Sequence, residues 1–148
     1  MRHGFIKVAA ATPSIKVADC AYNADRILSL VKEAHEEGVH LLVLPELCIT
    51  GYTCGDLFFQ QALIESAREC AIKVASRVPR NMVVVFGAPV ELRGKLHNCA
   101  IVACAGKVLG IVPKINIPNY QEFYEQRWFT PALPNEESVE FGDDVVYM

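Results

Sequence analysis

Several features that mark membrane, metal-binding or redox proteins are absent from this 148-residue sequence. No apolar run approaches the ~18 residues that a membrane-spanning helix needs, so we expect no membrane partner. The six cysteines form no Cys-x-x-Cys pair and the four histidines lack the spacing of metal ligands, so we expect no metal site. Most cysteines lie within apolar runs, which favours buried, reduced thiols and a cytoplasmic location.

Basic residues are absent from the last part of the sequence. All 14 Lys and Arg residues precede Thr130, whereas five of the 17 acidic residues follow it. The rest of the chain is close to neutral and carries no basic face, so nucleic acid is not expected as a partner. The acidic end is typical of a solvated loop, and it contains Glu136, Glu137, Glu140, Asp143 and Asp144.

The sequence does contain enough apolar material for one folded domain. With 148 residues, of which 52% are hydrophobic and 21% charged, the chain can bury a core and is too hydrophobic to be disordered. Segments with apolar residues every three or four positions alternate with short, continuous apolar runs. Helices are therefore predicted at 19–37 and 57–78, and strands at 5–11, 41–44, 82–88, 96–105 and from 107 through 112.

The predicted β-α-β-α-β-β-β order indicates an α/β layered domain with parallel pairing among its first strands. Asp19 is a candidate N-cap and Gly38 a candidate C′ residue of the first helix. The continuous apolar run at 41–44 is typical of a strand buried on both faces. Tight turns at Arg93-Gly94 and Ala105-Gly106 would add antiparallel strands.

The predicted elements do not complete a layered domain. Residues 140–148 begin another strand-like stretch without a helix after it. A sheet covered only by the predicted helices would leave one apolar face exposed, and complete domains avoid such faces. We therefore expect residues 1–148 to be the N-terminal portion of a larger domain whose later strands are absent from this chain.

Two predicted strands end at a proline followed by a charged residue, in Leu-Leu-Val-Leu-Pro-Glu46 and Gly-Ile-Val-Pro-Lys114. Charged groups at strand ends, next to loops, are where α/β proteins often place their chemistry. Glu46 is either a capping or ion-paired carboxylate or a general base in an apolar pocket. Lys114 is either a surface lysine or an ammonium positioned to stabilise an oxyanion. Their opposite charges favour an acid/base pair that faces one pocket.

The segment after Lys114 combines aromatic, acidic and basic side chains over residues 119–129, Asn-Tyr-Gln-Glu-Phe-Tyr-Glu-Gln-Arg-Trp-Phe. It is too polar for a core helix and too aromatic for an ordinary loop. Aromatic side chains with polar tips are typical of pockets for small polar ligands. The alternative is a helix that packs its aromatic side chains on the sheet.

Together these segments resemble the nitrilase, or carbon–nitrogen hydrolase, superfamily. The residues that carry the resemblance are Leu-Pro-Glu46 with Thr-Gly-Tyr52, and Pro-Lys114 with Ile-Pro-Asn-Tyr120 and Glu-Phe-Tyr-Glu125-x-Arg-Trp-Phe129. Both segments in this order are specific, and they are most similar to the N-terminal glutaminase domain of glutamine-dependent NAD⁺ synthetases. The match runs to about Pro131 and implies part of a nitrilase-type α-β-β-α sandwich.

The resemblance implies a Glu-Lys-Cys triad that hydrolyses glutamine to glutamate and ammonia. Glu46 would be the general base, and Lys114 would polarise the amide carbonyl. Tyr52, Tyr120 and Glu125 would shape the glutamine pocket, and this part of the protein would hold no cofactor or metal. The ammonia would amidate nicotinic acid adenine dinucleotide in a separate C-terminal synthetase domain, with ATP and Mg²⁺, so the whole enzyme would be a ligase. By analogy, a homo-oligomer is expected.

The sequence departs from the family's pattern at the nucleophile. The family's cysteine lies well after the lysine, and no cysteine follows Cys104. Cys48 belongs to the same turn as Glu46 and Cys54 to the next loop, so neither is expected to replace it. We therefore expect the 148 residues alone to be inactive on glutamine. The alternatives are a stand-alone amidase or carbamoylase, and a non-catalytic nitrilase-like module that binds a partner or ligand.

Overall fold

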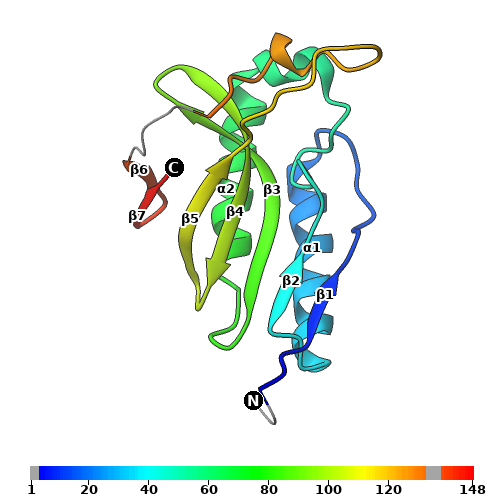
Figure 1. The fold of residues 1–148 in the computed structure, drawn as a ribbon, viewed down its shortest axis with the longest axis vertical. Helices are drawn as coiled ribbons and strands as arrows, with labels where there is room; N and C mark the ends of the chain where they lie inside the picture. Colours follow the sequence, from blue (N-terminus) through cyan, green and yellow to red (C-terminus); the bar gives the residue numbers. More distant parts are fainter. Residues whose placement is uncertain (1–3, 133–137) are drawn as a thin grey trace.

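The computed structural model describes residues 4–132 and 138–148, and a mixed β-sheet forms its centre (Figure 1). Five strands lie in this sheet in the order β1-β2-β3-β4-β5. β1, β2 and β3 pair in parallel, whereas β3, β4 and β5 pair as antiparallel hairpins. The bounds are Val8–Ala10 for β1, Leu41–Val43 for β2, Val83–Leu92 for β3, Lys95–Cys104 for β4 and Lys107–Pro113 for β5. The predicted α/β class and its parallel start are confirmed.

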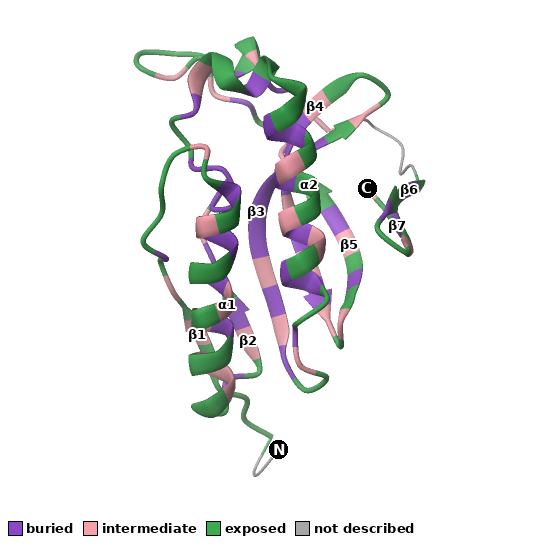
Figure 2. Cartoon of the chain, turned by 180° about the vertical axis from the view of Figure 1, so that it is seen from behind, coloured by how far each residue is buried: buried purple, intermediate pink, exposed green. Residues whose placement is uncertain are grey.

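Helix α1 (Cys20–Glu36) and helix α2 (Gln61–Ala75) lie on the same face of the sheet (Figures 1 and 2). The Asp19 carboxylate accepts a hydrogen bond from a backbone N–H of the first turn at 3.1 Å, and so caps α1 as predicted. α2 begins later than predicted because Gln60 is extended (φ −87°, ψ 115°) and separates it from the short 3₁₀ helix η1 (Gly55–Phe59). Neither helix, nor any other in the described ranges, is long and apolar enough to cross a membrane.

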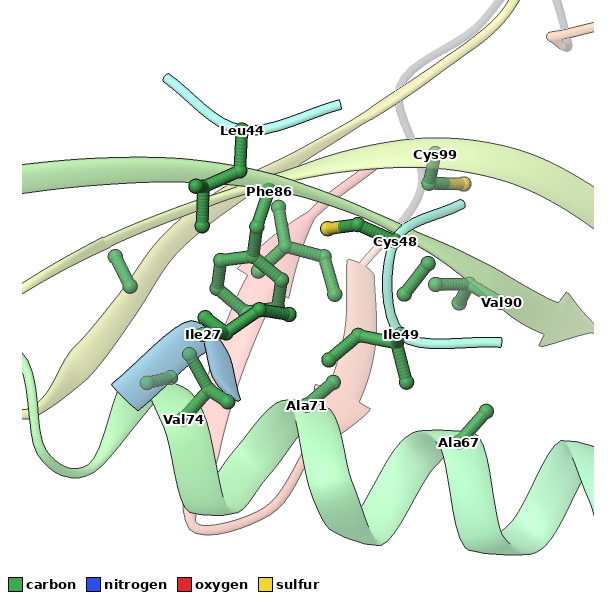
Figure 3. Packing of buried hydrophobic residues seen from close by; sticks show 14 of the residues in the cluster. Ile27, Leu44, Cys48, Ile49, Ala67, Ala71, Val74, Phe86, Val90 and Cys99 are labelled. Atoms are coloured by element: carbon green, nitrogen blue, oxygen red, sulfur yellow. The ribbon is translucent and has the colours of Figure 1, made fainter. Parts of the chain in front are cut away.

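The core lies between the two helices and the sheet face that they cover. Alternate β3 side chains point toward the helices and are buried: Val84, Phe86, Ala88 and Val90. The Phe86 ring lies close to Ile27 of α1 and Val74 of α2 (Figure 3). Ala67 and Ala71 turn toward the sheet, and their small side chains let α2 approach it closely.

The opposite face of the sheet is not covered by any helix of the described residues. Val43 of β2 is 41% exposed and Val112 of β5 is 59% exposed. The prediction that the run at 41–44 is buried on both faces is therefore wrong for the structure of this chain. Leu42 of the same strand is buried because it faces the helices. The apolar pattern on the other face has no described partner.

The two tight turns that the sequence predicts are both present. Arg93 and Gly94 connect β3 to β4 with φ values of 52° and 72°. Ala105 and Gly106 connect β4 to β5 with φ values of 55° and 76°. Positive φ at both central residues is the pattern of a type I′ turn, whose twist matches that of the flanking strands. These turns set the register of the β3–β4 and β4–β5 hairpins.

A two-stranded hairpin, β6 (Ser138–Phe141) and β7 (Asp144–Tyr147), packs beside β5 (Figure 1). The carboxylate of Asp144 accepts a hydrogen bond from the backbone N of Val108 in β5 at 2.9 Å. The hairpin therefore contacts the free edge of β5 at Val108.

The acidic end of the chain is thus not a solvated loop over its described residues. That prediction is wrong for Glu140 and Asp144, which lie in strands, whereas Asp143 lies in the exposed turn between them. The physical reason is the apolar residues between and after the acids, which the hairpin buries: Val139, Phe141 and Val146. Glu136 and Glu137 lie outside the described residues.

Gly87 lets the chain that follows β2 lie directly against β3. A Cβ atom built on Gly87 would be 2.2 Å from the backbone N of Leu47 and 2.7 Å from the carbonyl carbon of Glu46. Both neighbours are backbone atoms, which cannot turn aside as the end of a long side chain can. The absence of a side chain at this position therefore fixes where Glu46 leaves the sheet.

Gly87→Ala should destabilise the protein, because the new methyl group would force the turn after β2 away from β3. We expect the free energy of unfolding to fall by at least about 2 kcal/mol, as for other overpacked sites. Urea unfolding followed by circular dichroism measures this change. Gly110→Ala in β5 is the matched control, since its Cβ would meet only the carbonyl O of Tyr147 at 4.0 Å. Equal effects at the two glycines would contradict the close approach at Gly87.

Candidate active site

Glu46 lies in a turn directly after β2, and backbone hydrogen bonds attach this turn to β3. Gly87 N donates to the carbonyl O of Pro45 at 3.2 Å, and Ile49 N donates to the carbonyl O of Gly87 at 3.2 Å. Leu47 has a φ of 50°, so the chain changes direction immediately after the glutamate. The Glu46 carboxylate is therefore carried by backbone that is fixed on both sides.

Lys114 directly follows β5, and its backbone is also held on both sides. Its N–H donates to the carbonyl O of Asn98 at 2.8 Å, and its carbonyl O accepts from Ala132 N at 3.0 Å. The ammonium Nζ lies 2.7 Å from Oε1 of Glu46, although the two residues are 68 positions apart in the sequence. The two charged strand ends therefore meet in one ion pair.

Glu125 is a second carboxylate on the same ammonium. It begins the 3₁₀ turn η2 (Glu125–Arg127), and its two oxygens each lie 3.1 Å from Lys114 Nζ. Its side chain is only 4% exposed, and the Tyr52 hydroxyl donates to Oε1 at 2.5 Å. A buried carboxylate needs such partners, because burial of an unpaired charge is strongly unfavourable. Lys114 thus lies between two carboxylates, one half-exposed and one buried.

The two carboxylates keep Lys114 protonated. Burial acts to lower the pKa of Lys114, but the hydrogen bonds and negative charges of Glu46 and Glu125 outweigh it, and the pKa is raised. Burial, the hydrogen bond to Glu125 and the nearby carboxylates also raise the pKa of Tyr52. At neutral pH the site therefore contains an ammonium cation and a neutral phenol whose hydroxyl donates a hydrogen bond to Glu125.

Tyr120 does not join this cluster. Its side chain is 64% exposed, and its ring lies against Phe123 with the centroids 6.0 Å apart. Its role in a glutamine pocket stays a prediction. The segment 119–129 forms turns and the short η2 rather than a helix on the sheet, so that alternative is wrong. Phe129 is the buried aromatic of the segment, and its ring contacts Phe58 of η1 at 4.9 Å.

Two buried asparagines were not predicted, and only one of them, Asn98, contacts a charged residue of the site. Asn98 of β4 donates from Nδ2 to Oε1 of Glu46. Asn23 of α1 donates to the carbonyl O atoms of Lys16 and Ile49 at 2.8 and 2.9 Å, and accepts from Lys16 N at 2.7 Å. A polar residue within an apolar strand, or on the apolar face of a helix, is the sequence signal that could have found them, because a buried amide requires partners.

A second ion pair, also not predicted, fixes the segment that carries Glu125. Asp56 of η1 accepts hydrogen bonds from Nε and Nη2 of Arg127 at 2.7 and 2.9 Å, and from Nε1 of Trp128 at 3.0 Å. The bonds from Arg127 and then Trp128 lower the pKa of Asp56 to about 2. Because the two donors lie two and three residues after Glu125, these contacts attach η2 to η1.

Cys48 and Cys54, the cysteines of the turn and loop after β2, are not placed to act with Glu46. All six are free thiols in the described residues, and four of them are buried as predicted. Cys48 Sγ lies 3.6 Å from the carbonyl O of Gly87, and burial raises its pKa to about 11. Cys54 Sγ lies 3.2 Å from the carbonyl O of Thr50, and burial raises its pKa as well. Neither thiol is hydrogen-bonded to Glu46, so neither has a base that could activate it.

Two cavities border the charged cluster. Glu46, Asn98 and Lys114 line a cavity of about 340 Å³ on the sheet face that the helices leave uncovered. Tyr52 and Glu125 line another of about 310 Å³, together with Phe123, Tyr124 and Trp128 among others. A larger cavity of about 430 Å³ lies beside α1 and contains none of these residues. Over residues 4–132 and 138–148, no group of three or more His, Cys, Asp or Glu side chains could hold a metal ion.

The sheet with helices on one face, and a Glu–Lys pair at the ends of two of its strands, defines a class of hydrolase. Residues 7–147 match the family model described as "Carbon-nitrogen hydrolase". The chain therefore belongs to the carbon–nitrogen hydrolase family.

Within that family the chain is similar to glutamine-dependent NAD(+) synthetases. It is 34% identical over 142 residues to the one from Mycobacterium tuberculosis, covering 95% of this chain and 21% of the relative. It is 31% identical over 160 aligned positions to the human one, covering 95% of this chain and 23% of the relative. The crystal structure of the one from Cytophaga hutchinsonii superposes with a TM-score of 0.89 at 31% identity, covering 96% of this chain and 24% of that chain.

These matches confirm the resemblance and the nitrilase-type fold predicted from the two motifs. The chain spans about a fifth of the length of the curated relatives that it matches.

Asp56→Asn should make the protein's stability less sensitive to acid. Because the pKa of Asp56 is about 2 in the folded protein and ordinarily 3.8, ionised Asp56 contributes stability that is fully present above about pH 4 and is lost as the pH falls toward 2. The variant lacks this contribution and should lose less stability across that window. Urea unfolding, followed by the fluorescence of Trp128, the only tryptophan in the sequence, measures it.

The control is Asp143→Asn, since Asp143 is exposed in the β6–β7 turn. It should follow the unmodified protein at every pH. If Asp56→Asn and Asp143→Asn lost the same stability between about pH 4 and 2, the hydrogen bonds of Asp56 would not contribute in solution.

Proposed function

We propose that this chain is the N-terminal portion of the glutaminase domain of a glutamine-dependent NAD⁺ synthetase. This part of the enzyme hydrolyses glutamine to glutamate and ammonia. One observation carries the proposal: the Lys114 ammonium lies 2.7 Å from Glu46 and 3.1 Å from Glu125. It does so in a chain that is 34% identical over 142 residues to a curated synthetase of this kind.

The mechanism assigns a separate role to each charged group. A cysteine from a later part of the domain attacks the side-chain amide carbon of glutamine, and Glu46 accepts the thiol proton as the sulfur–carbon bond forms. Lys114 stabilises the oxyanion of the tetrahedral intermediate. The carbon–nitrogen bond then breaks, and the amide nitrogen leaves as ammonia with the proton from Glu46. Water hydrolyses the glutamyl thioester to glutamate and restores the thiol.

The other predicted residues support Lys114 and the substrate. Glu125 holds the ammonium in place, and Tyr52 in turn holds Glu125 through its hydroxyl. Together with Tyr120 they shape the glutamine pocket. The cavity of about 310 Å³ that Tyr52 and Glu125 line has room for a small amino acid.

The remaining parts of the enzyme lie outside these residues in this proposal. The uncovered apolar face, with Val43 and Val112 exposed, supports further strands that complete the sandwich. ATP and Mg²⁺ belong to a separate C-terminal domain in this proposal. That domain uses the ammonia to amidate nicotinic acid adenine dinucleotide, which makes the whole enzyme a carbon–nitrogen ligase. By analogy with the family, we place it in the cytoplasm as a homo-oligomer.

The decisive experiment compares the 148-residue chain with the product of the full coding sequence in which it occurs. The full product should release ammonia from glutamine and form NAD⁺ with ATP, whereas the 148-residue chain should do neither. Hydrolysis of other small amides but not of glutamine would replace this proposal with a stand-alone amidase or carbamoylase. No hydrolysis of any amide by the full product would favour the non-catalytic binding module.

Lys114→Ala in the full product should abolish glutamine hydrolysis. Loss of one oxyanion-stabilising donor lowers kcat by about 10²–10³-fold, and Lys114 also positions Glu46. NAD⁺ formation from added ammonium chloride should persist, because it bypasses the glutaminase and reports a folded protein. Lys32→Ala is the control, since Lys32 pairs with Glu36 at 3.8 Å on the exposed face of α1, away from Lys114. Equal loss of both activities would instead make Lys114 part of a structural ion pair.

A further inference from the structure

The two carboxylate oxygens of Glu46 have different surroundings. Oε1 accepts a hydrogen bond from Lys114 Nζ at 2.7 Å and a second from Nδ2 of Asn98. Oε2 accepts no hydrogen bond from the part of the chain that the structure describes. The oxygens of a free carboxylate are chemically equivalent, so the difference between them arises from these two donors.

Asn98 contacts both members of the ion pair. Its side-chain amide holds Glu46, and its backbone carbonyl O accepts from the N–H of Lys114 at 2.8 Å. The residue lies within β4, opposite Pro89 of β3, and is only 3% exposed. Such a buried amide on a strand is rigid, so it can fix the distance between Glu46 and Lys114.

We propose that Asn98 is a positioning residue: with Lys114 it occupies Oε1 of Glu46 and leaves Oε2 as the oxygen that takes the nucleophile's proton. An oxygen that already accepts two hydrogen bonds is a weaker proton acceptor than one that accepts none. Because the two donors approach Oε1, the thiol proton is transferred to Oε2. This inference rests on the proposed function, in which Glu46 is the general base.

The chemistry of the amide explains why asparagine suits this position. Its NH₂ group donates to a carboxylate without bringing a charge of its own. An aspartate at position 98 would be a third carboxylate near Lys114 and would have no proton to donate to Oε1 when ionised. Asn98→Asp therefore keeps the volume of the side chain but removes the donor, and Asn98→Ala removes the amide altogether.

The test uses the product of the full coding sequence with Asn98→Asp, Asn98→Ala and the control Asn23→Ala. Asn23 is also a buried asparagine, but its amide binds the backbone of Lys16 and Ile49 rather than Glu46. For both Asn98 variants we expect kcat for glutamine to fall about 10²-fold, the cost of a misplaced catalytic group, with KM changed less than about 3-fold. Asn23→Ala should lower the unfolding temperature and keep kcat per folded molecule.

A second measurement does not depend on glutamine. Alkylation of the nucleophilic thiol by iodoacetamide reports its deprotonation by Glu46 whatever the amide substrate is. It should slow by a similar factor in the Asn98 variants and be unchanged in Asn23→Ala. If the unmodified protein does not hydrolyse glutamine but its thiol shows this pattern, the proposed function fails and the role of Asn98 stands.

Three results would overturn the role of Asn98. The first is unchanged kcat and unchanged alkylation in Asn98→Ala or Asn98→Asp. The second is a loss expressed entirely as a higher KM, which would place Asn98 in substrate binding. The third is failure of both Asn98 variants to fold while Asn23→Ala folds, which would make the residue structural.

Discussion

The site depends on the ion pairs that the Lys114 ammonium forms with Glu46 and Glu125. The ammonium joins three parts of the chain that are distant in sequence: the turn after β2, the end of β5 and the η2 segment. Burial of Glu125 is strongly unfavourable unless a cation compensates its charge, and Lys114 provides that cation. The same two carboxylates raise the pKa of Lys114, so the ammonium remains charged at neutral pH. Neither charge would be stable in this position without the other.

Around this ion pair, hydrogen bonds and close backbone packing replace flexible side-chain contacts. Asn98 links Glu46 to Lys114, and Asp56 attaches the segment after Glu125 to η1. Gly87 lets the backbone of Glu46 lie directly on β3. These contacts come from strands and short turns, which hold side chains more precisely than long loops do. The arrangement keeps the Glu46 carboxylate and the Lys114 ammonium at a fixed separation.

The sheet explains why the site is half-open. Helices α1 and α2 cover one face (Figure 2). The charged cluster borders a cavity on the other face. Under the proposed function, further strands cover this face and supply the thiol that Glu46 deprotonates. The fold would then place the base and the cation on one sheet and the nucleophile on a later strand. Cys48 and Cys54 do not take that place, because both are buried and bind backbone carbonyls.

The sequence by itself determined the order of helices and strands, the two turns, both charged strand ends and the family. These follow from residues that are neighbours in the chain: apolar periodicity, glycine at turns and proline before a charge. Only the tertiary structure decided that Glu46 and Lys114, 68 residues apart, meet at 2.7 Å, that Asn98 joins them and that Tyr120 lies outside the cluster. It also decided that the acidic end forms a hairpin. Contacts of this kind depend on strand pairing and loop paths over long sequence separations, which local patterns do not specify.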